Sequence, residues 1–169
     1  MITVPSPLGA LRLCAREGAL VGVYFEGHRP PPRFAPDALA RVDEPVLVQA
    51  RAELAEYLAG ARTRFEVPIA IEHGTPFERA VWSALTTIPH GERISYAELA
   101  RRIDRPRAVR AVGAANGRNP LSIVLPCHRV VGAGGALTGY AGGLERKAWL
   151  LDHEARGAGS IAGGAARAI

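Results

Sequence analysis

Residues 126–130, Pro-Cys-His-Arg-Val, place a thiol beside an imidazole at the end of the apolar run 123–125. An aliphatic run that stops at proline is typical of a buried strand, so we expect Cys127 at the edge of a core. Burial raises the pKa of a thiol unless a partner compensates, and cysteine reacts as the thiolate. His128 could be that partner, through a turn at Pro126 or a bridging water. The pair fits nucleophilic catalysis, with an inert core cysteine as the alternative.

The composition is that of a folded protein. Its 169 residues, 48% of them hydrophobic, suit one large domain or two small ones. No apolar stretch approaches the roughly 20 residues of a membrane span, and residues 1–5 lack the features of a signal peptide. We therefore expect a cytoplasmic protein that does not bind membranes and whose cysteines, Cys14 and Cys127, stay reduced. Taken by itself, Cys14 is expected to be a small core residue.

Positive charge is concentrated in the second half of the chain. Residues 1–74 hold 8 basic and 9 acidic side chains, whereas residues 75–156 hold 12 basic and 7 acidic. The basic residues are arginines except for Lys147. Arginine makes planar, bidentate contacts with phosphate, so the excess favours a polyanionic partner. A solvated charged surface is the other explanation that these counts allow.

Residues 1–74 are predicted to form a domain of mixed α and β structure. Strands are expected over residues 8–15, 19–25 and 65–69, the first two joined as a hairpin. The proline-rich residues 26–40 are expected to form a loop, and residues 45–60 show the 3.6-residue hydrophobic period of a helix.

Residues 75–156 are predicted to form a second, helical domain. Thr75-Pro76 caps and starts one helix, and Ser95 to Glu98 has the spacing of a capping box that opens a short helix. After a turn, Pro106 begins another helix that runs toward Asn116-Gly117. Short helix, tight turn and second helix are the helix-turn-helix arrangement.

The chain is expected to end with one more helix and a flexible tail. Residues 139–143, Gly-Tyr-Ala-Gly-Gly, form a turn that could line a pocket and that precedes a helix closing at Glu154. A carboxylate near an imidazole would fix its tautomer and raise its basicity, although a surface glutamate is the alternative. The glycine- and alanine-rich residues 157–169 are predicted to be the tail.

The second helix of the helix-turn-helix combines small residues with arginines. Small side chains allow close backbone approach, and arginines bind phosphate, so this helix could enter a narrow groove of DNA. Arg110 lies among the small residues and could replace a base removed from the stack, although an ordinary surface arginine is the alternative. The residues of this surface are Arg105, Arg107, Arg110, Ala111, Gly113 and Ala114.

Several motifs together resemble the O6-alkylguanine-DNA alkyltransferase family, also called methylated-DNA–protein-cysteine methyltransferases. They are Ser95-Tyr96, Arg110 to Gly113, Asn119-Pro120, Pro126 to Val130, and Tyr140 before Gly142-Gly143. The resemblance covers about residues 75–154 and implies an α+β protein: an N-terminal ribonuclease H-like α/β domain, then a helical, winged-helix-like domain that contains the helix-turn-helix. It also implies a single, irreversible transfer of the alkyl group of O6-alkylguanine, and of O4-alkylthymine, from duplex DNA to the protein's own cysteine.

The resemblance assigns catalytic roles residue by residue. Cys127 would accept the alkyl group, and His128 would take its proton through a water. Glu154 would orient His128, and Asn119 would hold the turn that presents the site. Tyr96 would help to rotate the guanine out of the duplex and would then protonate its N3.

Substrate and DNA contacts follow from the same resemblance. Carbonyls of Cys127 and Val130 would recognise the exocyclic amine, the amide of Ala141 would meet O6, and Tyr140 would wall the pocket. Arg110 would fill the gap in the duplex. The helix-turn-helix, with Ser95 beside it, would bind the minor groove, the protein acting as a monomer that could bind DNA cooperatively.

Neither a metal nor another cofactor is expected. Some relatives hold zinc through two cysteines and histidines, but here Cys14 stands with only scattered His28 and His73. Asn116 occupies a position where some relatives have an apolar pocket residue, which leaves the tolerated alkyl size open. Two other functions remain: a cysteine hydrolase or acyltransferase that uses Cys127, His128 and Glu154, and a DNA-binding module without chemistry.

Overall fold

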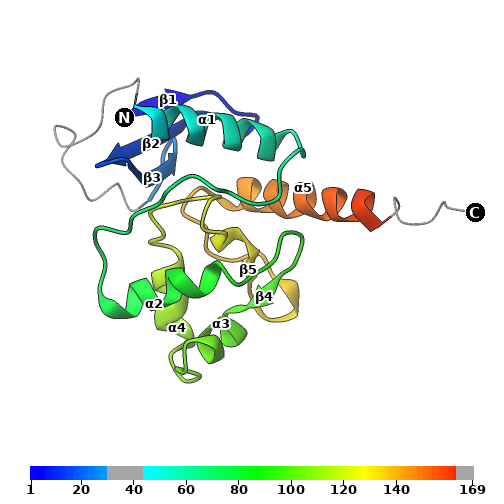
Figure 1. Cartoon of the computed structure of the whole chain (residues 1–169). Helices are drawn as coiled ribbons and strands as arrows, with labels where there is room; N and C mark the ends of the chain where they lie inside the picture. The colour runs from blue at the N-terminus through cyan, green and yellow to red at the C-terminus, as the bar shows by residue number, and fades with distance from the viewer. Residues whose placement is uncertain (30–43, 163–169) are drawn as a thin grey trace, which may run out of the picture.

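The N-terminal part of the protein is a three-stranded antiparallel sheet with one helix packed on it (Figure 1). The structure, a computed structural model, describes residues 1–29 and 44–162, with side chains as far as residue 157. The sheet has the order β1 (Ile2–Val4), β2 (Leu11–Arg16), β3 (Ala19–Phe25), and the helix is α1 (Pro45–Leu58). Expected loop residues 30–40 lie outside the described residues.

The hairpin of β2 and β3 confirms the sequence prediction. Its turn residues Glu17 and Gly18 have positive φ angles of 49° and 75°. Cys14 is fully buried in β2, as expected of a core residue. The sequence does not predict β1, because three residues are too few to show an alternating pattern.

The strand expected over residues 65–69 is absent. The segment touches the sheet through one parallel bridge between Leu20 and Ile69. Pro68 has no amide hydrogen, and two other amides of the segment donate to the buried Glu53 carboxylate of α1, at 2.8 and 3.2 Å. The backbone is therefore held by the Glu53 side chain together with two backbone hydrogen bonds to Leu20, not by a continuous ladder.

The C-terminal part contains three short helices that pack on one another. They are α2 (Pro76–Leu85), α3 (Tyr96–Arg102) and α4 (Val109–Asn116). Two short parallel strands, β4 (Ile94–Ser95) and β5 (Val130–Val131), join α3 to the segment that carries Cys127. The expected helix-turn-helix is therefore formed by α3 and α4.

The helix caps agree only in part with the sequence prediction. Thr75 and Glu78 form a complete capping box at α2. Ser95 accepts a hydrogen bond from the amide of Glu98, but the Glu98 carboxylate pairs with arginines of the same helix and does not complete the box. Arginine partners at helical spacing therefore outcompete the backbone amide for this carboxylate.

Helix α4 begins at Val109, not at Pro106 as predicted. Asp104 has a positive φ of 56°, and the amide of Ala108 donates to the Arg105 carbonyl at 2.8 Å. Pro106 thus lies inside a tight turn, where its fixed φ is equally acceptable.

The apolar run before Cys127 is buried, but it is not a strand. Ile123 has a φ of 72°, and the amide of Leu125 donates to the Leu121 carbonyl at 2.8 Å, so the segment is a series of turns. Ile123 and Leu125 are each 1% exposed. A short apolar run shows burial without deciding the backbone conformation, which explains the error.

The last helix, α5 (Leu144–Ala162), runs past Glu154, where it was expected to close. The first part of the predicted tail, as far as residue 162, is therefore helical. Residues 163–169 lie outside the described part of the chain. Helix α5 lies between the N-terminal sheet with α1 and the helices of the C-terminal part (Figure 1). Among the described residues no helix is long and apolar enough to cross a membrane.

Candidate active site and DNA-binding surface

Cys127 begins a 3₁₀ turn, Cys127–Arg129, that follows Pro126. Its amide donates to the Leu125 carbonyl at 2.8 Å, and the residue is 3% exposed. The turn replaces the strand end expected from the sequence and places the thiol within the core that joins both parts of the chain.

Asn119 holds the turn that presents Cys127. Its side-chain nitrogen donates to the Leu125 carbonyl at 2.8 Å and to the Cys127 Sγ at 3.0 Å, and its Oδ1 accepts from the Leu121 amide at 3.0 Å. One buried amide thus shapes the backbone and contacts the reactive sulfur.

His128 and Glu154 form a buried pair. The His128 Nε2 lies 3.0 Å from Glu154 Oε1, and the two residues are 0% and 1% exposed. Burial opposes ionisation of Glu154, but hydrogen bonds from His128 and Arg129 hold its pKa far below the usual range. An ionised carboxylate only accepts hydrogen bonds, so Nε2 carries the proton and Nδ1 is the basic nitrogen. Nδ1 has no hydrogen-bond partner among the described residues.

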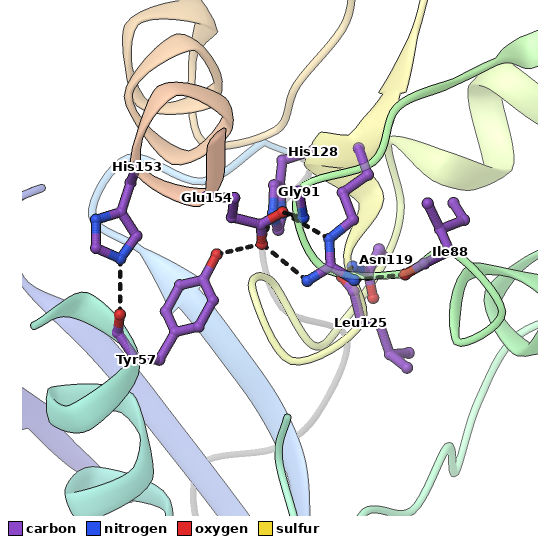
Figure 2. Close-up of polar contacts among 9 residues, drawn as sticks. Tyr57, Ile88, Gly91, Asn119, Leu125, His128, His153 and Glu154 are labelled. Carbon is purple, nitrogen blue, oxygen red and sulfur yellow. Dashed lines mark hydrogen bonds and ion pairs between the residues drawn. The ribbon is translucent and has the colours of Figure 1, made fainter. Parts of the chain in front are cut away.

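The Glu154 carboxylate is held by four residues (Figure 2). Oε1 accepts from His128, from Arg129 Nη2 at 2.8 Å and from the Tyr57 hydroxyl at 2.6 Å. Oε2 accepts from Arg129 Nε at 2.9 Å and from the Gly91 amide at 3.0 Å. A buried carboxylate with this many donors stays charged and fixed in orientation.

Thiol and imidazole are both neutral at rest. Burial raises the pKa of Cys127 to about 11, although the Asn119 hydrogen bond and Lys147 lower it. Burial also lowers the pKa of His128, with Glu154 acting in the opposite direction. Both shifts favour the neutral thiol and the neutral imidazole, so forming a thiolate at Cys127 needs a base that takes its proton.

Lys147 is fully buried in α5 and close to the site. Burial lowers its pKa to about 8, and Cys127 opposes this shift. Its Nζ donates to the Thr138 carbonyl at 2.7 Å and lies 5.7 Å from the centre of the Tyr96 ring. The sequence analysis did not place Lys147 in the site. As the only lysine in a chain with 20 arginines, it could have been singled out.

Burial raises the pKa values of Tyr96 and Tyr140, two of the remaining predicted pocket residues, and both lie close enough to Cys127 for its charge to raise them further. The Tyr96 hydroxyl donates to the carbonyls of Thr138 and Gly139 at 3.1 and 3.3 Å. The Tyr140 hydroxyl is buried without a hydrogen-bond partner in the described residues. Val130, in β5, pairs with Ile94 of β4, directly before Ser95 and Tyr96.

Ala141 and Asn116, which the sequence analysis also considered, both take part in hydrogen bonds. The Ala141 carbonyl accepts from the Arg29 amide at 3.3 Å, which ties the glycine-rich loop to the N-terminal part. The Asn116 side-chain nitrogen donates to the Cys127 carbonyl at 3.3 Å, and its Oδ1 is buried without a partner within residues 1–29 and 44–157. The carbonyl expected to recognise the substrate thus accepts one hydrogen bond from Asn116 and has a second lone pair left to accept another.

Helix α4 exposes the residues expected to contact DNA. Arg110, Ala111 and Ala114 are exposed. Gly113 is half-buried, and a Cβ atom added at this position would lie 3.7 Å from the Tyr96 ring. Arg105 and Arg107 are exposed in the preceding turn. Ser95 lies half-buried at the start of α3, where its hydroxyl caps the helix.

Comparison with known proteins identifies the family. Residues 2–71 match the ribonuclease-like domain of 6-O-methylguanine DNA methyltransferase, and residues 76–156 match its DNA-binding domain. The chain is 44% identical over 155 residues to methylated-DNA–protein-cysteine methyltransferase of Mycolicibacterium paratuberculosis, covering 91% of each chain. The chain belongs to the O6-alkylguanine-DNA alkyltransferase family. The resemblance seen in the sequence, and the fold it implies, are thereby confirmed.

Other relatives agree with this assignment. The inducible methylated-DNA–protein-cysteine methyltransferase of Bacillus subtilis is 48% identical over 153 residues, covering 90% of this chain and 83% of that protein. The crystal structure of Mycobacterium tuberculosis OGT in complex with DNA matches with a TM-score of 0.80 and 41% identity, covering 92% of both chains.

Three residues of the candidate site lie outside the sequence prediction, namely Tyr57, the ion-paired Arg129 and Lys147. Tyr57 continues the hydrophobic stripe of α1, so nothing in the sequence separates it from an ordinary core residue. Arg129 belongs to the recognised motif, but its pairing with Glu154 depends on the tertiary fold. Within the described residues, no group of three or more His, Cys, Asp or Glu side chains could hold a metal ion.

Proposed function

We propose that this protein repairs alkylated duplex DNA by transferring the alkyl group of O6-alkylguanine, and of O4-alkylthymine, to Cys127 in a single irreversible turnover. The observation that carries this proposal is a buried thiol held by Asn119 next to a His128–Glu154 pair. The family and the names of its members support the reaction class. The match to an OGT structure in complex with DNA supports a DNA partner.

In the proposed reaction, sulfur attacks the alkyl carbon and the carbon–oxygen bond of the guanine breaks. The thiol proton passes through a water to Nδ1 of His128, whose Nε2 stays bonded to Glu154. The Tyr96 hydroxyl gives its proton to N3 of the departing guanine and regains one from solvent, and protonated His128 releases the former thiol proton to solvent. The product is a thioether, which has no facile hydrolytic exit, so each molecule reacts once.

Access to the base requires that it leave the duplex. The exposed Arg110 and the small residues of α4 suit insertion into the minor groove, with Arg110 filling the space of the flipped nucleotide. Tyr140 then walls the pocket, the Cys127 and Val130 carbonyls meet the exocyclic amine, and the Ala141 amide meets O6. The protein acts as a cytoplasmic monomer, and cooperative binding along DNA is compatible with this arrangement.

A cysteine hydrolase would use the same thiol, imidazole and carboxylate. It leaves the arginine-bearing helix without a role, and the comparisons favour alkyl transfer. The two functions differ in stoichiometry, because a hydrolase turns over repeatedly on an ester, whereas the alkyltransferase stops after one equivalent.

The decisive experiment is mass spectrometry after incubation with duplex DNA that contains O6-methylguanine. We expect the intact protein to gain one methyl group, located on the Cys127 peptide. The Cys127→Ala variant should gain none while still binding DNA. An unchanged mass of the wild-type protein, or methylation of the variant at the same rate, would overturn the proposal.

A further inference from the structure

Tyr57 links the N-terminal part of the protein to the catalytic carboxylate. It lies in the last turn of α1, is 0% exposed, and donates a 2.6 Å hydrogen bond to Glu154 Oε1 across a sequence separation of 97 residues. Figure 2 shows its ring directed from α1 toward Glu154 on α5. Among the described residues 1–74, it is the one that donates a hydrogen bond to this carboxylate.

The bond is made to the oxygen that serves His128. Oε1 also accepts from His128 Nε2 at 3.0 Å and from Arg129 Nη2 at 2.8 Å. Each donor withdraws negative charge from the oxygen, so the Tyr57 hydroxyl limits how strongly Glu154 can stabilise a protonated His128. It also opposes rotation of the carboxylate away from the imidazole.

Tyr57 is itself rigidly placed. Its carbonyl lies 2.7 Å from His153 Nε2, and its ring packs edge-on against the rings of His90 and His153. Burial and the neighbouring Glu154 raise the pKa of Tyr57 well above its usual value, so the hydroxyl remains a donor over the working pH range.

We propose that Tyr57 is a positioning residue of the alkyl-transfer site, whose hydroxyl holds Glu154 Oε1 against His128 and moderates the proton affinity of that imidazole. The inference rests on the proposed role of His128 as the base for Cys127. It makes the N-terminal part of the chain a contributor to the chemistry, in addition to any structural role.

The test is Tyr57→Phe in the full-length protein, which removes one oxygen and keeps the ring. We expect the second-order rate constant for methyl transfer to fall about tenfold at neutral pH, in line with loss of a hydrogen bond to a charged group. With one donor fewer, Glu154 stabilises the imidazolium more strongly, so the acidic limb of the rate–pH profile should move to higher pH. The charged groups that act on His128 are Glu154, Arg129 and Lys147, and the rings of His90 and His153 pack against Tyr57.

Tyr24→Phe is the matched control, because Tyr24 is another buried tyrosine of the N-terminal part and belongs to the cluster of Cys14 and Val21. It should leave the limb in place. The His128 pKa is also measured by NMR in wild type and Tyr57→Phe, which gives a readout that does not need activity. An unshifted imidazole pKa and limb would overturn the inference. A wild-type protein that takes up no methyl group would instead overturn the proposed function.

Discussion

The side-chain nitrogen of Asn119 lies 3.0 Å from the sulfur of Cys127 and 2.8 Å from the carbonyl oxygen of Leu125. The same group therefore closes the turn before the nucleophile and touches the nucleophile itself. Reactivity and local folding are coupled through one amide, and a change at this residue should be visible in both.

Replacing Asn119 with leucine keeps the branched shape of the side chain but removes both its donor and its acceptor. The Leu125 carbonyl and the Leu121 amide lose their partner in a buried site, so the free energy of unfolding should fall by about 1–3 kcal/mol. The thiol pKa should rise further above 11, because the Asn119 hydrogen bond lowers it in the wild type. Denaturant unfolding and the pH dependence of thiol alkylation measure the two effects. A variant with wild-type stability and thiol pKa would contradict the dual role.

Acid should destabilise the protein through the His128–Glu154 pair. The pKa of Glu154 is depressed in the fold, so its contribution is present above the unfolded value of about 4.3 and is lost as the pH falls below it. The pKa of His128 is also lowered, so the unfolded chain binds a proton first, below about pH 6.5. Both effects therefore lower the free energy of unfolding as the pH falls. Urea unfolding at pH 7.5, 5.5 and 4 should give steadily lower stability, and a flat response would refute this account.

The sequence predicted which side chains lie together in the candidate site better than it predicted the backbone around them. Cys127, His128 and Glu154 were identified because thiol, imidazole and carboxylate are distinctive and the motifs are long. The conformation of residues 123–125 was not, because an apolar run indicates burial alone and Asn119 supplies the hydrogen bonds that a strand would need.

The same limit explains the two other kinds of error. The hydroxyl of Tyr57 cannot be distinguished from a core ring until α1 and α5 are brought together. Residues 65–69 have the composition of a strand, but the carboxylate of Glu53 captures their amides from a neighbouring helix. Local sequence patterns predicted that the helices exist, although not all of their ends. Tertiary hydrogen bonds determined the backbone of residues 65–69 and 123–125 and the contact of Tyr57 with Glu154.

Substitution of Arg110 by alanine should separate DNA handling from chemistry. The residue is exposed on α4, away from the hydrogen-bonded site at Cys127. We expect methyl transfer from duplex DNA to slow at least about tenfold, because stabilisation of the flipped state is lost and flipping costs a few kcal/mol. Reaction with the free base O6-methylguanine should be nearly unchanged.

Arg12→Ala is the control for Arg110→Ala, since Arg12 is an exposed arginine on the N-terminal sheet. It should alter neither reaction. Equal losses on duplex and free base in Arg110→Ala would remove the proposed role of that residue.

DNA binding by the wild type should also weaken steeply with salt, because phosphate contacts release counterions, and a flat salt response would argue against the arginine surface.

Lys147 should act on the thiol through its charge. The Lys147 ammonium lowers the pKa of Cys127, and Cys127 in turn raises the pKa of Lys147, so each group favours the ionised form of the other. Burial nevertheless reduces the pKa of Lys147 to about 8. Lys147→Met keeps an unbranched, buried side chain and removes the charge, so the thiol pKa should rise and methyl transfer at pH 7.5 should slow. Rates of thiol alkylation against pH, for wild type and variant, measure this shift directly. If the ammonium merely holds the loop through the Thr138 carbonyl, thermal stability will fall while the thiol pKa stays at its wild-type value, and the electrostatic role is refuted.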